Sequence, residues 1–372
     1  MPARLPPEDD AGDSQLRMPI EAALAEQLKA GRAAPSDDAD PAPGGAPAGN
    51  GGPLRVAVAL SGGADSAMLA VHSALAQRRL SRIELHCFHI HHGLQEVADD
   101  WRAHVHRLAH GLNVPCHSLR VRVESGSGKG VEAAAREARY QGFSHLAGQT
   151  GVSHILLAHH RNDQAETVLL RLLRGAGPTG LGAMAPVMRR DGLTYLRPWL
   201  DVDRGLVVAA AQGYAARTGW AAVHDPTNID DAYTRGAVRR RLVPALDERW
   251  PAWRTTLSRH ARQARDLAAL VDEIAAEDFG RLDPTADGSE FSLAAWRALG
   301  PQRRALVLRH WLALRGLRAP TEARMRELCR QLDGLHALGH DRAMRLQHEG
   351  HWIRCVRGRV SLLRINDRQE SL

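Results

Sequence analysis

The sequence feature that most constrains this fold is a pair of glycines directly after a short apolar run. Residues 56–69 read VAVALSGGADSAML, so a β-branched stretch enters a Ser-Gly-Gly-Ala-Asp-Ser loop, which opens into a helix with periodic apolar residues. Glycine lets the backbone turn tightly and point successive N–H groups at an anion, and the helix N-terminus adds a favourable dipole. We therefore predict a phosphate-binding loop formed by Ser61, Gly62, Gly63, Ala64, Asp65 and Ser66.

Asp65 is unusual in a site for anions alone. A carboxylate beside a phosphate is repelled unless a divalent cation lies between them, so Asp65 predicts a nucleotide bound with Mg²⁺. The alternative is that Asp65 or Ser66 merely caps the following helix and the glycines only make a tight turn. The loop has neither the Gly-Lys-Ser/Thr end of a Walker motif nor GxGxxG spacing.

Strand-like and helical patterns alternate between residues 54 and 220. We predict strands over 55–60, 83–89, 116–123, 154–158 and 195–196, and helices near 67–79, 97–111, 131–149, 163–174 and 202–218. This alternation predicts an α/β fold, a doubly wound parallel sheet that binds its ligand at the carboxyl ends of the strands.

The flanking segments differ in composition. Residues 1–52 are rich in Ala, Pro, Gly and Asp and predict a disordered extension with one short helix near 20–30. We expect the nucleotide-binding domain over 53–225 and a linker helix region over 226–250. Residues 251–372 predict a mainly helical domain that ends in a small β hairpin at 345–365, with its turn at Arg357-Gly358.

Charge and cysteine content restrict the function further. Residues 53–372 carry 45 basic against 33 acidic side chains, which favours a nucleic-acid partner. The four cysteines form no CxxC pair, which argues against a disulfide framework or a structural zinc site. No apolar stretch approaches the length of a membrane span and the N-terminus has no signal-peptide core, so we expect a cytoplasmic protein without a membrane partner.

Two clusters follow predicted strands. In His89-Ile-His-His-Gly, we expect His91 and His92 to line the nucleotide pocket, with solvated strand-end histidines as the alternative. In the second cluster, Asp163 and Glu166 have the spacing of an N-cap and its capping-box partner. The functional alternative is that His160 and Asp163 face Asp65 and hold Mg²⁺ or the reacting base.

Basic residues gather in three further segments. Arg136 lies on a predicted helix over 132–140, where surface ion pairing is the default and contact with a phosphate the alternative. The segment 171–184 holds so many glycines that we predict a mobile loop that closes over substrate. After residue 234, arginines interleave with Trp250 and Trp253, as on a surface that contacts RNA, although a solvated helix face has the same pattern.

SGGADS resembles the SGGxDS signature of the PP-loop ATP pyrophosphatases. Together with HIHHGL, EAAAREARY, AHHRNDQAET, RGAGPTGLGAM, RPW and DPTNIDDAYTRGAVRRRLVP, in this order over about 54–255, it makes the chain similar to the tRNA(Ile)-lysidine synthetase family. Two positions depart from that family's pattern. Asn162 precedes Asp163 where the family usually has paired aspartates, and Gly236 follows Arg235 where Asn is common.

The resemblance implies a two-step reaction on the wobble cytidine of the CAU anticodon of tRNA(Ile). ATP adenylates the oxygen at ring position 2 with release of diphosphate, and the amine of free L-lysine then attacks that carbon and releases AMP. The rivals are a PP-loop tRNA thiolase and an RNA-binding protein that keeps a nucleotide loop without turnover. The oligomeric state stays open, a homodimer included.

The candidate site residues fall into four groups. Asp65, Asp163 and Arg136 are the candidate catalytic residues, and Asp65 and Asp163 are the candidate Mg²⁺ ligands. The nucleotide is assigned to the SGGADS loop with His91, His92 and His160. The tRNA is assigned to Arg174, Gly175, Gly177, Arg235 and Arg239, and residues 251–372 to a tRNA-binding domain.

Overall fold

The computed structural model describes residues 11–33, 52–91, 98–122, 131–223, 234–335 and 344–365. The chain divides into two compact units, Met1–Gln263 and Ala264–Leu372. This division falls inside a single long helix, α10 (Trp253–Gly280), rather than at residue 251.

The first unit is built around a six-stranded sheet. Its strands are β1 (Leu54–Ala59), β2 (Ile83–His91), β3 (Cys116–Arg120), β4 (His154–Leu156), β5 (Val187–Arg190) and β6 (Leu193–Leu196), in the order β3-β2-β1-β4-β6-β5. Every neighbouring pair is parallel except β5–β6, so the predicted doubly wound parallel sheet is confirmed. The prediction missed β5, which a tight turn at Asp191 and Gly192 joins to β6.

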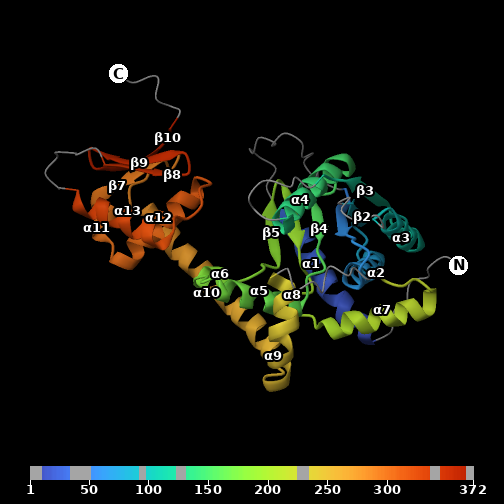
Figure 1. The fold of residues 1–372 in the computed structure, drawn as a ribbon. Coiled ribbons are helices and arrows are strands. Elements are labelled where there is room, and N and C mark those ends of the chain that lie inside the picture. The colour runs from blue at the N-terminus through green and yellow to red at the C-terminus, as the bar shows by residue number, and fades with distance from the viewer. Residues whose placement is uncertain are drawn as a thin grey trace. The chain divides into compact units, whose positions relative to one another are not determined.

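Helices cover both faces of this sheet (Figure 1). The helices of this part of the chain are α2 (Ala64–Arg79), α3 (Ala98–Gly111), α4 (Val131–Thr150), α5 (Arg161–Leu173), α6 (Pro178–Leu181) and α7 (Arg204–Thr218). Val56 and Val58 of β1 pack in one core with α2, α3 and α7, while Ala57 between them packs in the core with α4. Alternate strand residues therefore serve opposite cores, which explains why this strand is apolar throughout.

The predicted disordered extension is wrong for residues 11–33, which form helix α1 (Ala11–Ala33). Leu16, Ile20 and Leu24 recur at a spacing of four residues and are fully buried in the core with α2 and α7. The carbonyl of Leu16 also accepts a hydrogen bond from the Trp199 indole at 2.8 Å. The helix forms despite Pro19 in its interior because tertiary packing supplies the stability that its own sequence lacks.

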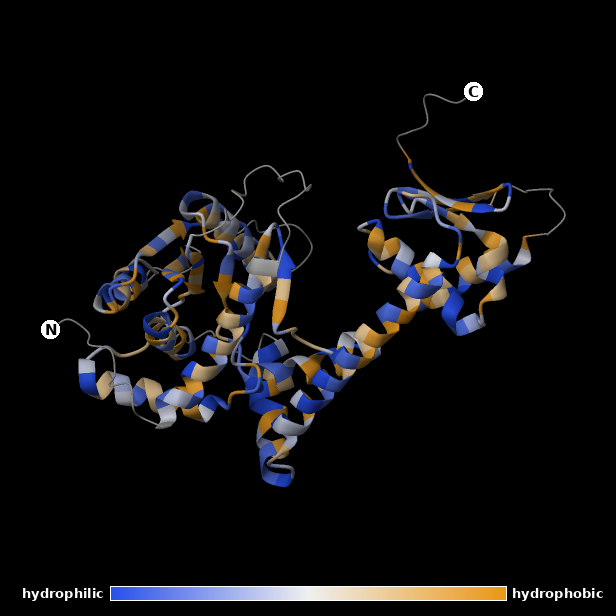
Figure 2. Cartoon of the chain, turned by 180° about the vertical axis from the view of Figure 1, so that it is seen from behind, coloured by the Kyte–Doolittle hydropathy of each residue, from blue (hydrophilic) through white to orange (hydrophobic). Residues whose placement is uncertain are grey.

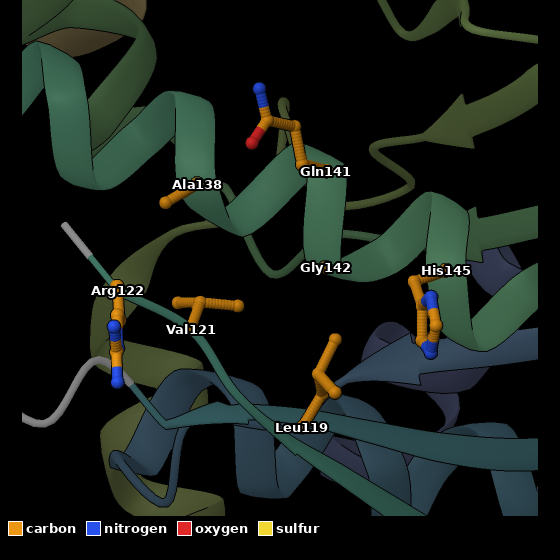
Figure 3. Close-up of a pocket in the computed structure, with 7 residues that line it drawn as sticks. All are labelled: Leu119, Val121, Arg122, Ala138, Gln141, Gly142 and His145. Carbon is orange, nitrogen blue, oxygen red and sulfur yellow. The ribbon is translucent and has the colours of Figure 1, made fainter. Parts of the chain in front are cut away.

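Helix α4 lies close to β2 and β3 because Gly142 has no side chain. A Cβ atom at Gly142 would lie 2.8 Å from Ile90 Cδ1 and 3.2 Å from Val121 Cγ1, so a larger residue would push the helix away. A hollow of about 270 Å³ lies beside this contact, at the edge of the sheet. Figure 3 shows the side chains that line it. Its lining residues are Leu119, Val121, Arg122, Ala138, Gln141, Gly142 and His145.

The first unit continues through α8 (Thr234–Ala237), the π-helical turn η2 (Val238–Leu242), α9 (Val243–Arg249) and the start of α10. The second unit contains β7 (Glu290–Ser292), α11 (Leu293–Ala298), α12 (Pro301–Leu314), α13 (Glu322–Gly334), β8 (Met344–His348), β9 (His351–Val356) and β10 (Arg359–Arg364). Its sheet is antiparallel in the order β7-β10-β9-β8 and covers a core that includes Phe291, Trp296 and Trp311. The expected turn at Arg357-Gly358 joins β9 to β10.

Hydrophilic and hydrophobic residues alternate along the helices (Figure 2), as expected for helices with one face in a core and one in solvent. Within the described ranges, none of the helices combines the length and apolarity needed to cross a lipid bilayer.

Candidate active site

The glycine turn after β1 adopts a conformation that only glycine fits well. Gly62 has a φ of +97°, and a Cβ atom there would lie 3.2 Å from Val105 Cγ1. The carbonyl of Gly62 accepts a hydrogen bond from the backbone N–H of Val223 at 2.9 Å. The turn is thereby fixed from behind by the chain that follows α7.

Helix α2 begins directly after this turn without a side-chain cap. Its N-cap residue is Gly63, so neither Asp65 nor Ser66 caps the helix as the alternative interpretation required. The Ser66 hydroxyl instead accepts from the Ser61 backbone N–H at 3.1 Å and donates to the Gly63 carbonyl at 3.1 Å. Because no described side chain caps it, the first turn of α2 keeps its N–H groups and its dipole available to an anion.

Helix α5 begins at the end of β4, which is the neighbour of β1 in the sheet. The strand order reverses between these two strands, where open α/β sheets bind their ligands. The capping box of α5 differs from the predicted one. His160 is the N-cap and Asp163 is its partner, with the Asp163 N–H donating to His160 Nδ1 at 3.4 Å and the His160 N–H donating to Asp163 Oδ2 at 3.2 Å.

The His160 ring joins the two helix starts. Since His160 Nδ1 accepts a hydrogen bond, Nε2 carries the ring proton, and it lies 3.3 Å from Asp163 Oδ2 and 3.7 Å from Asp65 Oδ2. His160 is buried and Asp163 nearly so. The predicted meeting of Asp65, His160 and Asp163 at one edge of the sheet is therefore present in the structure.

Asp163 stays ionised in this environment. Burial alone would raise its pKa, but electrostatic interactions with His160, His159 and Arg235 and the hydrogen bond from the His160 backbone lower the pKa below its ordinary value. Arg239 Nη2 also lies 3.3 Å from Asp163 Oδ1.

Arg239 is bound mainly by Glu166, which is buried on the second turn of α5. Its Nε and Nη2 donate to the two Glu166 oxygens at 2.9 Å each, a bidentate pair. Burial works against the charge of Arg239, but Glu166, Asp163 and Asp65 raise its pKa above the ordinary value. Arg235 donates to the Thr167 hydroxyl at 3.1 Å, so both arginines are held against α5.

The two candidate Mg²⁺ ligands differ in how they fit a cation. The Oδ1 atom of Asp65 is buried and accepts no hydrogen bond from a described residue, and Arg204 Nε approaches it only to 3.8 Å. Asp163 is already engaged by His160 and Arg239. The described residues hold no group of three side chains that could ligate a metal by themselves. Of these two carboxylates, Asp65 is therefore the one that fits Mg²⁺ well. The cation would take its remaining ligands from phosphate oxygens and water.

Arg136 faces other arginines. Burial and the Arg136 charge lower the pKa of Arg171, and burial is also the main reason that the pKa of Arg197 is lowered, with Arg136 contributing. The Arg136 guanidinium lies 5.6 Å from the centre of the Tyr140 ring. This concentration of positive charge on α4, α5 and the end of β6 favours an anionic ligand.

The glycine-rich segment after α5 is anchored at two points, and its predicted mobility and closure over substrate stay predictions. Gln164 exchanges two hydrogen bonds with the backbone of Met184, at 2.9 and 3.0 Å, and Arg171 donates to the Gly180 carbonyl at 2.6 Å. Helix α6 contains Gly180 and ends shortly before Met184. Of the predicted tRNA residues, Arg174 is exposed at the end of α5, Gly175 has a φ of +73°, and Gly177 is the N-cap of α6.

His91 is buried at the carboxyl end of β2, and its role toward the nucleotide stays a prediction. His92 lies outside the described residues, as do Lys129 and residues 225–233 of the DPTNIDDAYT motif. On the same strand, His89 forms a hydrogen bond through Nδ1 with the Leu60 carbonyl at 2.9 Å, which places it directly behind the glycine turn.

Sequence reasoning missed three roles at this site. The sequence pattern predicted Glu166 as a capping-box partner, and it assigned no role to Gln164 or Arg204. The one usable signal was the spacing of Gln164 and Glu166 from the apolar stripe of α5, because Gln164 falls beside Ala165 and Val168 on the buried side. Nothing local indicated the Arg239 partner, which lies 73 residues away from Glu166.

Two sequence families match this chain. The family described as a PP-loop domain matches residues 47–246, and the family described as the TilS substrate binding domain matches residues 291–361.

Several proteins called tRNA(Ile)-lysidine synthase are similar to this chain. That of Bordetella bronchiseptica is 58% identical over 308 residues, which are 83% of this chain and 89% of that protein. That of Ralstonia nicotianae is 46% identical and covers 78% of this chain and 61% of that protein. Among solved structures, the U34-tRNA thiolase NcsA from Methanococcus maripaludis matches with a TM-score of 0.47 at 12% identity, over 58% of this chain and 72% of that chain.

Proposed function

The chain belongs to the tRNA(Ile)-lysidine synthase family, and from this premise we propose that it ligates free L-lysine to position 2 of the wobble cytidine in the CAU anticodon. It is an ATP-dependent enzyme of tRNA modification. In the proposed reaction, the carbonyl oxygen on carbon 2 of the cytosine attacks the α-phosphorus of ATP and diphosphate leaves. The lysine amine then attacks carbon 2 of the ring, AMP leaves with the oxygen, and the amine loses its proton.

The observation that carries this proposal is the meeting of two helix starts where the strand order reverses. The uncapped first turn of α2 offers backbone N–H groups to phosphate, and Asp65 and the His160–Asp163 pair stand beside it. Preorganised donors of this kind stabilise the charge that develops on a phosphate as it is transferred. We assign the phosphates to the SGGADS loop and propose Asp65, Asp163 and Arg136 as the catalytic residues.

We propose that Mg²⁺ accompanies the nucleotide and is held by Asp65. Support comes from the buried Oδ1 atom of Asp65, which no described residue satisfies. When bound, the cation would neutralise charge on the phosphates. Asp163 is better explained as the ionised partner that orients His160 and Arg239 than as a metal ligand.

The environment of the two cysteines in the first unit argues against the cysteine-dependent chemistry of a tRNA thiolase. Cys87 and Cys116 are paired in register on β2 and β3 inside the sheet. Burial raises the pKa of Cys87 well above its ordinary value and raises that of Cys116 to about 12. A thiol that stays protonated is a poor nucleophile and a poor metal ligand.

We further propose that residues 53–225 form the catalytic domain, 226–250 a linker helix region and 251–372 a tRNA-binding domain. The TilS substrate binding domain over 291–361 supports the last assignment. Arg174, Gly175, Gly177, Arg235 and Arg239 are assigned to the tRNA side of the site. A cytoplasmic location suits an enzyme that consumes ATP, free lysine and tRNA.

The deciding experiment follows labelled lysine into a tRNA(Ile) transcript with the CAU anticodon, in the presence of ATP and Mg²⁺. We expect lysine incorporation with release of one diphosphate per lysine. A methionine tRNA, which carries the same anticodon in a different body, is the control substrate. Incorporation of sulfur, or RNA binding without diphosphate release, would refute the proposal.

Asp65→Ala tests the role of the glycine turn. We expect it to abolish diphosphate release while it leaves the affinity for tRNA within about twofold of wild type, because Asp65 lies at the nucleotide end of the site. Asp191→Ala, an exposed carboxylate in the β5–β6 turn, is the matched control and should retain full activity.

A further inference from the structure

A second hollow lies where α5 meets α9 and the start of α10, all within the first unit. Its volume is about 500 Å³, inside the range of roughly 300–1,000 Å³ that is usual for small-ligand sites. The lining is mainly apolar and aromatic: Leu169, Leu246, Trp250, Pro251, Trp253 and Leu257. The reaction proposed above does not use this hollow.

The two tryptophans of this hollow have different roles. Trp253 is buried, its indole N–H donates to Asp247 Oδ1 at 2.8 Å, and the Arg254 guanidinium lies 4.5 Å from the centre of its ring. Trp253 is therefore fixed as part of the fold. Trp250 is 58% exposed and contacts Arg249, whose guanidinium carbon lies 5.9 Å from the centre of the Trp250 ring. Trp250 leaves much of its flat surface open to solvent.

The apolar surface continues along α5. Leu172 and Leu173 lie about one turn beyond Leu169 and are 53% and 69% exposed. Leu242 is also exposed. A group of large exposed apolar side chains beside an open aromatic ring indicates a binding surface, since single exposed leucines are common and clustered ones are not.

The excess of positive charge in the segment that forms the hollow favours an anionic ligand. Residues 234–263 contain eight arginines against two carboxylates, Asp247 and Glu248, and Asp247 is paired with Arg254. Arg174 is exposed at the end of α5. Arg249 lines the hollow beside its apolar and aromatic residues. This arginine and the excess of arginines in the surrounding segment suit single-stranded RNA, because arginines bind the phosphates while an aromatic ring stacks on a base.

The hollow is also close to the candidate active site. Both lie along α5, and Leu169 follows Asp163 by six residues, about 9 Å along the axis at the α-helical rise per residue. The hollow is therefore only a few nucleotides away along an RNA strand whose reacting base lies at Asp163.

We propose that this hollow holds one unstacked base of the tRNA strand next to the reacting cytidine, with the base stacked on Trp250. The proposal rests on the proposed function, since it needs tRNA at the active site. It assigns Trp250 to positioning of the substrate and Arg249 to the adjoining phosphate.

The test compares Trp250→Ala with Trp250→Phe in the full chain, with a CAU anticodon stem-loop as the RNA. We expect alanine to weaken binding by about tenfold to a hundredfold, the usual loss for a stacked base, and phenylalanine to restore most of it. Leu206→Ala is the matched control, because Leu206 is a partly exposed apolar residue on α7, away from the hollow. We expect it to bind like wild type. All variants should melt at the wild-type temperature, since Trp250 is exposed.

Salt dependence separates stacking from general charge attraction. Trp250→Ala should leave the slope of log K against log salt unchanged, whereas Arg249→Gln should reduce its magnitude by about 0.7, the value for one phosphate contact to a single strand. In addition, 2-aminopurine placed beside the wobble position should lose fluorescence on binding to wild type but not to Trp250→Ala.

Three results would overturn the proposal. The first is unchanged RNA affinity for Trp250→Ala. The second is a 2-aminopurine signal that does not depend on Trp250. The third is a change of molecular mass in light scattering for Trp250→Ala, which would make the hollow a contact between two copies of the chain. Failure of the proposed function is distinguishable, because it appears as absent lysine incorporation by the wild-type chain whatever the RNA affinity is.

Discussion

Helix α1 offers a sharp test of how this fold is held together, because composition and structure give opposite expectations for residues 11–33. Ile20 is fully buried against α2 and α7, and Met18 on the same helix is 62% exposed. Ile20→Ala removes three carbon groups worth about 0.8 kcal/mol each, and the cavity left behind brings the expected loss to about 2–5 kcal/mol. Met18→Ala should cost no more than about 0.5 kcal/mol.

The assay is urea unfolding of the full chain followed by tryptophan fluorescence, together with hydrogen exchange of the α1 amides. Trp199 is a local probe, since its indole donates to the Leu16 carbonyl. For Ile20→Ala we expect a lower transition midpoint for the first unit and faster exchange throughout α1. The same transition midpoint and the same α1 exchange rates for Ile20→Ala and Met18→Ala would refute the reasoning. Residues 11–33 would then be disordered, as their composition suggests.

Two further predictions concern single buried side chains. Gln164→Ala should speed tryptic cleavage at Arg174 and lower lysidine formation, because both hydrogen bonds between Gln164 and the Met184 backbone are lost. Gln164→Glu keeps the acceptor and loses the donor, so its cleavage rate should fall between those of wild type and Gln164→Ala. Equal cleavage rates in wild type and Gln164→Ala would contradict the role of these hydrogen bonds in holding the segment. Burial lowers the pKa of His154 to about 4. Between about pH 6.5 and pH 4 the imidazole therefore binds a proton in the unfolded chain but not in the folded chain. The free energy of unfolding should fall by up to about 1.4 kcal/mol for each pH unit across this range. The free energy of unfolding, measured with urea at pH 7 and pH 5, should differ less between the two pH values for His154→Asn than for wild type. The same difference in both proteins would contradict this role of His154.

The parts of this fold that follow from local pattern were predictable. The apolar run before Gly62 and the periodic helix after it require only neighbouring residues, and so do the parallel strands and the helices α3, α4, α5 and α7. The same holds for the meeting of Asp65, His160 and Asp163, because parallel strands bring their carboxyl ends to one edge.

The features that depend on distant residues were not predictable from pattern. Helix α1 contains Pro19 and a short apolar stripe, and its packing against α2 and α7 stabilises it. Glu166 has the spacing of a capping-box residue, but it binds Arg239, which lies 73 residues later in the sequence. Strand β5 is short and half exposed, so its residues carry no clear alternation, and its pairing with β6 defines it.

The chain positions of the site residues have a consequence for synthesis. Asp65, His160 and Arg239 come from three widely separated parts of the chain, and Arg239 completes the ion pairs around Asp163 and Glu166. A nascent polypeptide that has emerged only as far as α7 can fold most of the sheet and its glycine turn, but it lacks the guanidinium that neutralises those carboxylates. Maturation of the catalytic centre is therefore a late event in translation, and a prematurely terminated product ending before residue 239 would carry the turn without a finished centre around it.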